Sequence, residues 1–257
     1  MTALVHQLEE FVPPQELFRA RANYAEVARN LFGVLLEAGG VREGERVLDV
    51  GCGTGRLAVP LVDHLGPTGS YEGFDNNAAR IDWCNERIAP LHPNFHFRAI
   101  GVYNSRSRPG EVPAEEFTFP YPDEDFDLVF LFSVFTHMLP GGVERYLSEI
   151  ARVLKPHGRT VITWCLLNDE SRHALVEQRD QRREPATNAQ EARFSRDLGV
   201  YRVADPRHPE FAVAFDEEFA LRCYEQSGLE VEEPIRYGSW IGRENTLMNQ
   251  DVVIARR

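Results

Sequence analysis

The segment Val47-Leu-Asp-Val-Gly-Cys-Gly-Thr-Gly55 carries an apolar strand that runs directly into a turn with three glycines. Glycine accepts the positive φ angles of a tight turn and lets a ligand approach the backbone closely. The N–H groups of such a turn, with the N-terminus of the next helix, form a partly positive cradle. The segment therefore predicts a ligand-binding loop between a strand and a helix.

Two common uses of a glycine loop do not fit the neighbouring residues. A dinucleotide-binding turn has the pattern G-x-G-x-x-G, and here Arg56 stands at the position of the third glycine. A phosphate-binding loop requires Gly-Lys followed by Ser or Thr, which does not occur in this segment. The pattern that remains is Asp-x-Gly-x-Gly-x-Gly, which begins at Asp49.

Strands and helices alternate along most of the chain. Apolar runs between turn residues predict strands at 46–50, 70–74, 94–100, 126–132 and 160–167, and helices at 13–38, 56–65, 78–89 and 143–154. A charged stretch at 168–210 shows no clear strand, and a helix at 216–227 and strands at 229–234 and 251–255 follow it. This alternation predicts an α/β fold with a mostly parallel sheet and helices on both faces.

The composition limits the kinds of binding partner and the cellular compartment that we expect for this protein. With 257 residues, 43% of them hydrophobic and 26% charged, the chain has the composition of a globular protein. The net charge of -12 disfavours a nucleic-acid partner. The first ten residues lack the pattern of a signal peptide, and no apolar run is long enough to span a membrane. Four scattered cysteines indicate reduced thiols, and we expect a cytoplasmic protein without a metal.

Four features in this order resemble the class I S-adenosylmethionine-dependent methyltransferases over most of the chain. They are the glycine loop, an acid at Asp75 about twenty residues later, the strand that begins Phe126-Asp-Leu-Val, and the turn Leu154-Lys-Pro-His-Gly158. The resemblance implies a Rossmann-like fold, with a seven-stranded mixed sheet whose C-terminal hairpin is reversed. It also implies a single domain over residues 1–257, with residues 1–40 as an N-terminal helical lid.

The resemblance also implies S-adenosylmethionine as cofactor and assigns residues to it. The expected cofactor residues are Asp49, Gly51, Cys52, Gly53, Thr54 and Gly55 in the loop, Asp75 and Asn76 at the ribose, Gly101 and Val102 at the adenine, and Phe132 and Ser133 after the fourth strand. One position departs from the family, because Gly101 stands where an acidic residue usually contacts the adenine amino group. Asn104 is a candidate to supply that polar contact.

His137 is the candidate catalytic residue, because it follows the fourth strand at the sheet edge where such folds build their pockets. A histidine can accept the proton that a hydroxyl loses when it is methylated. The alternative is a structural histidine that fixes its loop.

Candidates for the acceptor side are Tyr24, Asn168, Trp240 and Arg243. We expect a helical or irregular insertion at 168–212 to cover the acceptor site. Alternatively, this charged segment forms a solvated surface or a homodimer contact.

The expected function is methyl transfer to a small molecule, in the first instance O-methylation of a sugar or secondary metabolite. The finer expectation comes from a likeness of Trp83-Cys84 and Ser133-Val-Phe-Thr-His-Met138 to bacterial members of the family. Alternatives are a small-molecule N-methyltransferase and a non-catalytic protein that binds S-adenosylmethionine. A dehydrogenase that uses NAD is a further alternative at the level of the fold.

Overall fold

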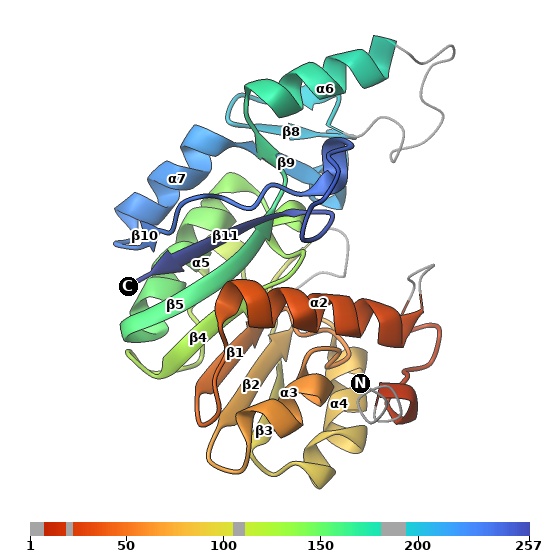
Figure 1. The fold of residues 1–257 in the computed structure, drawn as a ribbon, viewed down its shortest axis with the longest axis vertical. Coiled ribbons are helices and arrows are strands. Elements are labelled where there is room, and N and C mark those ends of the chain that lie inside the picture. Colours follow the sequence, from red (N-terminus) through yellow and green to blue (C-terminus); the bar gives the residue numbers. More distant parts are fainter. Residues whose placement is uncertain (1–7, 19–22, 105–110, 181–193) are drawn as a thin grey trace. The chain divides into compact units, whose positions relative to one another are not determined.

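The structure is a computed structural model that describes residues 8–18, 23–104, 111–180 and 194–257 (Figure 1). A seven-stranded sheet has the strand order β10-β11-β5-β4-β1-β2-β3, and a second, four-stranded sheet has the order β6-β9-β8-β7. Strands β10 and β11 are antiparallel, whereas β1 is parallel to both β2 and β4. The predicted α/β fold with a mixed seven-stranded sheet is therefore confirmed. No helix among the described residues has both the length and the apolar character needed to cross a bilayer.

The chain divides into two compact units, and strand β5 contributes residues to both. The first unit holds the described residues up to Gly101 with residues 121–132 and 153–161. Its elements are α2 (Tyr24–Gly39), β1 (Arg46–Val50), α3 (Ala58–Leu65), β2 (Ser70–Asp75), α4 (Ala78–Arg87), β3 (Phe95–Ala99), β4 (Phe126–Leu131) and the first part of β5 (Leu154–Trp164).

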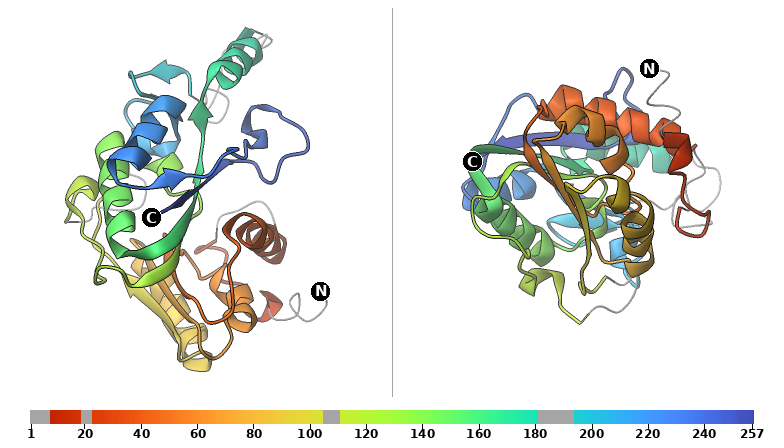
Figure 2. Two further views of the ribbon diagram at one scale, coloured as in Figure 1. Left: turned by 60° about the vertical axis from the view of Figure 1, so that its left-hand side comes forward. Right: turned by 90° about the horizontal axis from the view of Figure 1, so that it is seen from below.

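Parallel pairing in the first unit brings two acids to the same edge of the sheet. Asp49 on β1 lies opposite Gly73 on β2, and Asp75 closes β2 opposite Ala99 on β3. Both acids therefore lie at the carboxyl ends of neighbouring strands, where α/β proteins bind ligands. Helix α4 packs against β2 and β3, and α2 packs against α3 (Figure 2).

Helix α2 begins later than the sequence predicts. Asn23 is its N-cap, and the side-chain oxygen accepts hydrogen bonds from the backbone N–H groups of Ala25 and Glu26. The described residues 13–18 form turns and irregular backbone, and residues 19–22 lie outside the described part. The prediction of a helix from residue 13 is therefore wrong for 13–18. The cap decides the boundary, because it satisfies N–H groups that the first helical turn leaves without partners.

Strand β5 also differs from its prediction, since it begins at Leu154 and not at Thr160. The residues expected to stop the preceding helix form its first part, with His157 at a φ of 65°. A Cβ atom at Gly158 would lie 2.8 Å from the carbonyl oxygen of Lys155. The residues predicted to form a turn therefore do bend the backbone, but the bend lies within the start of strand β5.

The second unit consists of residues 102–120, 133–152 and 162–257, of which 105–110 and 181–193 lie outside the described part. Its elements are α5 (Pro140–Val153), the end of β5, β6 (Leu166–Leu167), α6 (Asp169–Asp180), β7 (Arg196–Asp197), β8 (Tyr201–Val203), β9 (Val213–Asp216), α7 (Glu217–Gln226), β10 (Glu230–Val231) and β11 (Asp251–Arg256), with the short 3₁₀ helices η2 (Ala114–Glu116), η3 (Phe135–His137), η4 (Pro209–Phe211) and η5 (Ser239–Ile241).

The insertion after the fifth strand contains β-structure that the sequence does not reveal. Strands β7 and β8 lie within the stretch that shows no strand pattern, and they join β9 and β6 in the four-stranded sheet. Each has only two or three residues, and both residues of β7 are exposed. Elements so short carry no alternating pattern, so only the pairing of β7 with β8 and of β8 with β9 defines them.

A buried guanidinium joins α2 to the sheet of the first unit. Arg159 on β5 forms a bidentate ion pair with Glu45, with distances of 2.8 and 2.9 Å. It also donates hydrogen bonds to the carbonyl oxygens of Gly39 and Gly40 at the end of α2. All three guanidinium nitrogens therefore have partners in a site that excludes water.

Replacing Arg159 with Met should lower the free energy of unfolding by about 3–5 kcal/mol, because it leaves a mostly buried carboxylate unpaired. Lys155→Ala is the matched control, since its ion pair with Asp127 is partly exposed, and it should cost less than about 1 kcal/mol. Chemical denaturation of the two variants measures the difference. Equal losses would contradict the importance of the buried pair.

Candidate cofactor and active site

The glycine loop follows β1 and has the backbone geometry that its sequence predicts. Gly51, Gly53 and Gly55 have φ angles of 81°, 57° and 70°, a region that favours glycine. The N–H groups of Gly51 and Cys52 donate to the carbonyl oxygen of Phe74 at 2.8 and 3.0 Å. The loop is therefore fixed to the end of β2.

Asp75 connects this loop to the next helix. One carboxylate oxygen accepts a hydrogen bond from the N–H of Gly53 at 3.0 Å, and the other accepts one from the N–H of Asn77 at 2.8 Å. Burial raises the pKa of this carboxyl group, and the two backbone hydrogen bonds oppose the rise. The predicted acid and the predicted loop thus meet, and both carboxylate oxygens are held in place.

The glycines of the loop have different surroundings. A Cβ atom built at Gly53 would meet nothing within 4 Å, whereas one at Gly55 would lie 2.6 Å from the side chain of Ile88. Gly53 therefore presents backbone to open space, which is the cradle that a ligand requires. Gly55 serves close packing against α4.

Cys52 contributes its backbone to the loop, and its side chain packs on β2. Its thiol sulfur would lie 3.0 Å from a Cβ atom at Gly73. Burial raises the pKa of Cys52 well above its ordinary range, which favours the neutral thiol. Cys84 on α4 donates a weak hydrogen bond to the carbonyl oxygen of Gly53, with a sulfur-to-oxygen distance of 3.6 Å. Both thiols thus pack around the loop as small apolar groups.

Asp49 is buried beneath the loop. The hydroxyl of Tyr71 donates a hydrogen bond of 2.7 Å to its carboxyl group. Burial raises the pKa of Asp49 to about 7; the Tyr71 hydrogen bond and the charge of Arg56 oppose this rise, and Asp75 adds to it. The sequence alone did not reveal Tyr71 as its partner, although the pairing of β1 with β2 brings the two together.

Two aromatic residues near the N-terminus lie against the loop. The hydroxyl of Tyr24 donates to the carbonyl oxygen of Thr54 at 3.2 Å, and burial raises the pKa of Tyr24 to about 12. The ring of Phe18 packs edge-on against Tyr24, with centroids 4.9 Å apart. Tyr24, which we expected near the acceptor, is therefore held at the loop itself.

Arg56 is a charged residue that the sequence argument used only to exclude a dinucleotide site. Its guanidinium carbon lies 5.2 Å above the centroid of the Phe18 ring. Burial lowers the pKa of Arg56, and the side chain makes no ion pair within 4 Å in the described part of the chain. A cation–π contact stabilises by about 0.5–2 kcal/mol, whereas burying an ion costs several kcal/mol. The contact with the Phe18 ring alone therefore does not offset the free-energy cost of burying the Arg56 cation.

His137 lies in the second unit, at the end of η3. Its Nδ1 lies 3.2 Å from the carbonyl oxygen of Glu210, and a nitrogen at that distance from a carbonyl carries its proton. Asn104 donates to the carbonyl oxygen of His137 at 2.9 Å and to the carboxylate of Glu210 at 3.3 Å. The three residues therefore form a closed ring of hydrogen bonds that orients the imidazole. Asn104, a candidate for the adenine, contributes to this ring.

Ser133 and its neighbours form a second polar group in this unit. Ser133 has a φ of 60°, its N–H donates to the hydroxyl of Thr163 at 2.7 Å, and its hydroxyl donates to Gln250 at 2.9 Å. Gln250 donates in turn to Thr136 at 3.3 Å. The turn after β4 is thereby fixed to β5 and to the residue before β11.

The remaining cofactor candidates are placed as follows. Asn76 is half-buried between Asp75 and the N-cap of α4, and Phe132 is half-buried with its ring 6.0 Å from that of Phe130. Gly101 is exposed at the end of the first unit, and a Cβ atom there would meet nothing within 4 Å. Val102 begins the second unit and forms an isolated bridge with Val112.

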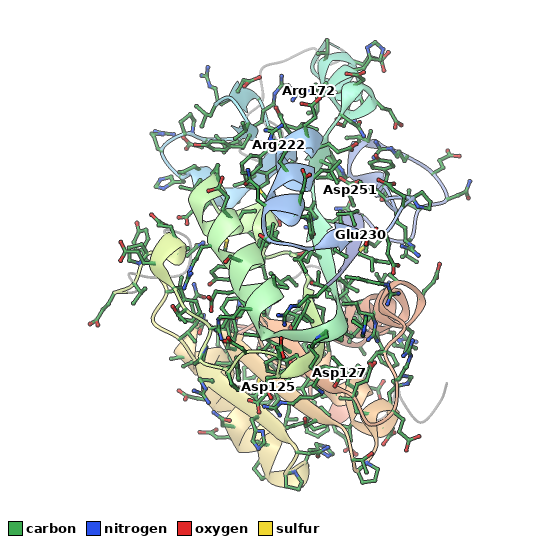
Figure 3. The ribbon with its side chains drawn as sticks, turned by 90° about the vertical axis from the view of Figure 1, so that its left-hand side faces the viewer. Asp125, Asp127, Arg172, Arg222, Glu230 and Asp251 are labelled. Atoms are coloured by element: carbon green, nitrogen blue, oxygen red, sulfur yellow. The ribbon has the colours of Figure 1, made fainter. Side chains whose placement is uncertain are left out.

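Two acceptor candidates of the second unit, Trp240 and Arg243, contact a buried acid, Asp251, which is labelled in Figure 3. Asp251 is fully buried and accepts hydrogen bonds of 2.7 Å from the backbone N–H of Leu166 and from the indole N–H of Trp240. Arg243 lies 3.5 Å from the same carboxylate and pairs with Glu170 at 2.9 Å. The sequence did not single out Asp251, because it reads as an ordinary strand residue.

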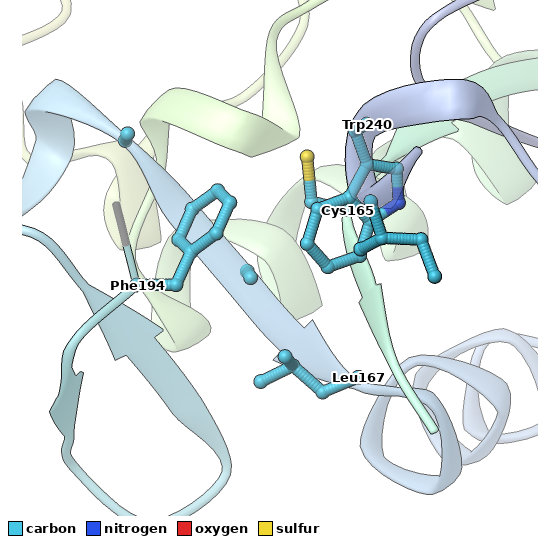
Figure 4. Close-up of a cluster of buried hydrophobic side chains, with 7 residues drawn as sticks. Cys165, Leu167, Phe194 and Trp240 are labelled. Atoms are coloured by element: carbon cyan, nitrogen blue, oxygen red, sulfur yellow. The ribbon is translucent and has the colours of Figure 1, made fainter. Parts of the chain in front are cut away.

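The side chain of Trp240 packs in an apolar cluster (Figure 4). Its ring meets that of Phe194 edge-on, with centroids 5.5 Å apart, and Cys165 and Leu167 belong to the same cluster. Asn168 caps α6 through Ser171 and donates to Glu217 at 3.0 Å. Trp240 and Asn168 thus have structural contacts, and an acceptor role for them stays a prediction.

The described residues contain no group of three or more His, Cys, Asp or Glu side chains arranged to hold a metal ion. The polar groups gathered at the loop are backbone N–H donors and carboxylate acceptors, which suit the hydroxyl groups and the amino-acid part of an organic cofactor. Such a fold with a glycine loop at this place is typical of α/β proteins that bind a nucleoside-type cofactor at the carboxyl ends of their parallel strands.

Comparison with known proteins shows what part of this chain is similar to. Residues 47–158 match a family model described as a methyltransferase domain. The chain is 33% identical over 130 residues to a ubiquinone/menaquinone biosynthesis C-methyltransferase of Pseudomonas savastanoi, covering 49% of this chain and 44% of that protein. It is 33% identical over 121 residues to a fatty-acid O-methyltransferase of Mycolicibacterium smegmatis, covering 47% of this chain and 37% of that protein. The chain therefore spans less than half the length of these curated relatives.

A solved structure extends the likeness to nearly the whole fold. The 1,6-didemethyltoxoflavin-N1-methyltransferase of Burkholderia thailandensis, with S-adenosylhomocysteine bound, aligns with a TM-score of 0.55 at 17% identity, covering 90% of this chain and 79% of that one. Residues 47–158 are thus similar to a methyltransferase domain, and the fold resembles that of a solved methyltransferase.

Replacing Asp75 with Ala should weaken S-adenosylhomocysteine binding by about 1–3 kcal/mol, because ribose hydroxyls and two backbone N–H groups lose their acceptor. Asp75→Asn keeps one acceptor oxygen and should lose less. Calorimetric titration measures both, with the exposed Asp82→Asn on α4 as control. Unchanged affinity in the Ala variant would contradict the role of Asp75.

The raised pKa of Asp49 predicts a pH dependence of stability. The folded state keeps this proton up to a pH of about 7, whereas the unfolded chain releases it near 3.8. Asp49 therefore makes the free energy of unfolding fall as pH rises between these values. From pH 5.5 to pH 8, Asp49→Asn should gain about 1–2 kcal/mol relative to the unmodified protein.

Denaturant titrations of the protein without cofactor at the two pH values measure this gain. The exposed Asp63→Asn on α3 is the control and should show no such difference. Parallel pH curves for Asp49→Asn and the unmodified protein would show that Asp49 is ionised in the folded state.

Proposed function

We propose that this protein transfers the methyl group of S-adenosylmethionine to a small molecule, and that the acceptor atom is a hydroxyl oxygen of a sugar or a secondary metabolite. The observation that carries the proposal is the bridge from Asp75 to Gly53 and Asn77, which holds an acid beside an open glycine cradle. The bound cofactor supplies a methyl group already activated by its sulfonium charge. The protein has to align the two reactants and exclude water.

The loop and Asp75 do the binding in this proposal. Gly53 offers backbone without a side chain, and Asp75 is already held by two N–H donors, so neither has to reorganise when the cofactor arrives. Such preorganisation saves the entropy of ordering the site during binding. Thr54, whose carbonyl oxygen accepts the Tyr24 hydroxyl, is fixed in the same way.

His137 accepts the acceptor's proton in this proposal. Its Nδ1–H donates to the carbonyl oxygen of Glu210, so the lone pair is on Nε2 in the neutral ring. A hydroxyl is a weak nucleophile until it loses its proton, and a base with this tautomer promotes that loss. The orienting ring with Asn104 and Glu210 supports a defined position for the imidazole.

C-methylation of an aromatic or quinol acceptor is the second candidate, since one of the relatives described above is a quinone-pathway C-methyltransferase. A hydroxyl on the ring would still need a base, so both candidates use His137 in the same way. N-methylation of a neutral amine needs less help from a base, and a protein that only binds the cofactor needs none.

Methyl-labelled cofactor incubated with the protein and a pool of small molecules tests these candidates. We expect a labelled product whose NMR spectrum shows a methyl group on oxygen; a methyl group on carbon or nitrogen would select the corresponding alternative. Tight cofactor binding without any labelled product would favour the non-catalytic alternative.

Replacing His137 with Gln should lower kcat by about 100-fold or more, because the hydroxyl loses its proton acceptor. The Kd for S-adenosylhomocysteine should stay the same. His96→Gln, on β3 and mostly exposed, is the control and should keep full activity. A His137→Gln enzyme with unchanged kcat would show that the histidine is structural.

A further inference from the structure

Arg56 places a positive charge directly after the glycine loop. Its guanidinium lies over the ring of Phe18, and the side chain is only partly exposed. In the described part of the chain it forms no ion pair within 4 Å, unlike Arg46 and Arg159 in the same unit, each of which pairs with a carboxylate. A partly buried cation without an anionic partner indicates a place for an anion.

The charged groups around Arg56 do not supply that anion. Asp49 attracts the guanidinium electrostatically, but its carboxyl group is held by Tyr71 and its pKa is raised to about 7. Arg80 repels the Arg56 charge and donates its own hydrogen bond to the carbonyl oxygen of Leu17. Neither residue therefore forms an ion pair with Arg56.

We propose that Arg56 binds the α-carboxylate in the amino-acid part of S-adenosylmethionine. The inference rests on the proposed function, because it takes the glycine loop as the cofactor site. A planar guanidinium donates two parallel hydrogen bonds to a carboxylate, and the Phe18 ring below fixes its plane. Arg56 adjoins Gly55 in the chain, so the charge belongs to the same loop that offers the open backbone of Gly53.

This assignment gives the N-terminal segment a function. Phe18 supports the guanidinium, and Tyr24 packs on Phe18 while it holds the carbonyl oxygen of Thr54. The segment would thus set the position of the residue that recognises the cofactor's charged end. Recognition of that end distinguishes S-adenosylmethionine from nucleosides that lack an amino-acid part.

Calorimetric titration with S-adenosylmethionine and with decarboxylated S-adenosylmethionine tests the proposal, because the two ligands differ only in the carboxylate. Arg56→Gln should weaken binding of S-adenosylmethionine about 10- to 100-fold. Its affinity for the decarboxylated ligand should stay within about two-fold, since that ligand makes no use of the guanidinium. Arg56→Lys keeps the charge but loses the two parallel donors. Its affinity for S-adenosylmethionine should therefore lie between that of the unmodified protein and that of Arg56→Gln.

Arg87→Gln is the matched control, because Arg87 is an exposed arginine that also stacks on an aromatic ring, that of Trp83. It should bind both ligands as the unmodified protein does. If Arg56→Gln weakened binding of both ligands equally, or left both affinities unchanged, Arg56 would not be the residue that binds the α-carboxylate. Unmodified protein that binds neither ligand would instead overturn the proposed function, and the assignment with it.

Discussion

The carboxylate of Asp75 is the interaction on which the rest of the site depends. It accepts one hydrogen bond from the glycine loop and one from the N-terminus of α4, and so joins two segments that a ligand must find in a fixed relation. Burial disfavours the charge, and the two N–H donors offset part of that cost. An acid held in this way can still offer its lone pairs to ribose hydroxyls, since each carboxylate oxygen accepts more than one hydrogen bond.

The charges around the loop are arranged unevenly. Asp49 and Asp75 lie at the ends of neighbouring strands, and a second carboxylate so close raises the cost of ionising the first. Tyr71 reduces that cost at Asp49 by donating its hydroxyl. Arg56 adds the opposite charge on the side where Phe18 and Tyr24 pack. A zwitterionic cofactor suits a site that contains both signs of charge.

The second unit uses its polar groups mainly to fix segments that carry function in our proposal. Glu210 lies in the insertion, and its backbone carbonyl sets the tautomer of His137. Asp251 collects donors from β6, η5 and Arg243 at a fully buried position. Leaving such an acid without its donors would be costly, because a buried charge requires partners. Hydrogen bonds that the charge-rich sequence does not display thus hold described residues of the insertion, such as Glu210 and Asn168.

The sequence by itself determined the alternation of strands and helices from β1 to β5, the glycine loop and Asp75, because each has a local signal: an apolar run, a set of glycines, or an acid at a strand end. It could not show that Tyr71 hydrogen-bonds Asp49, that Asn104 and Glu210 enclose His137, or that β7 and β8 form a sheet with β9. Those features join residues far apart in the chain through side-chain contacts and pairings with no periodic pattern. Only the tertiary structure decided them, because strand register and packing choose which polar groups meet.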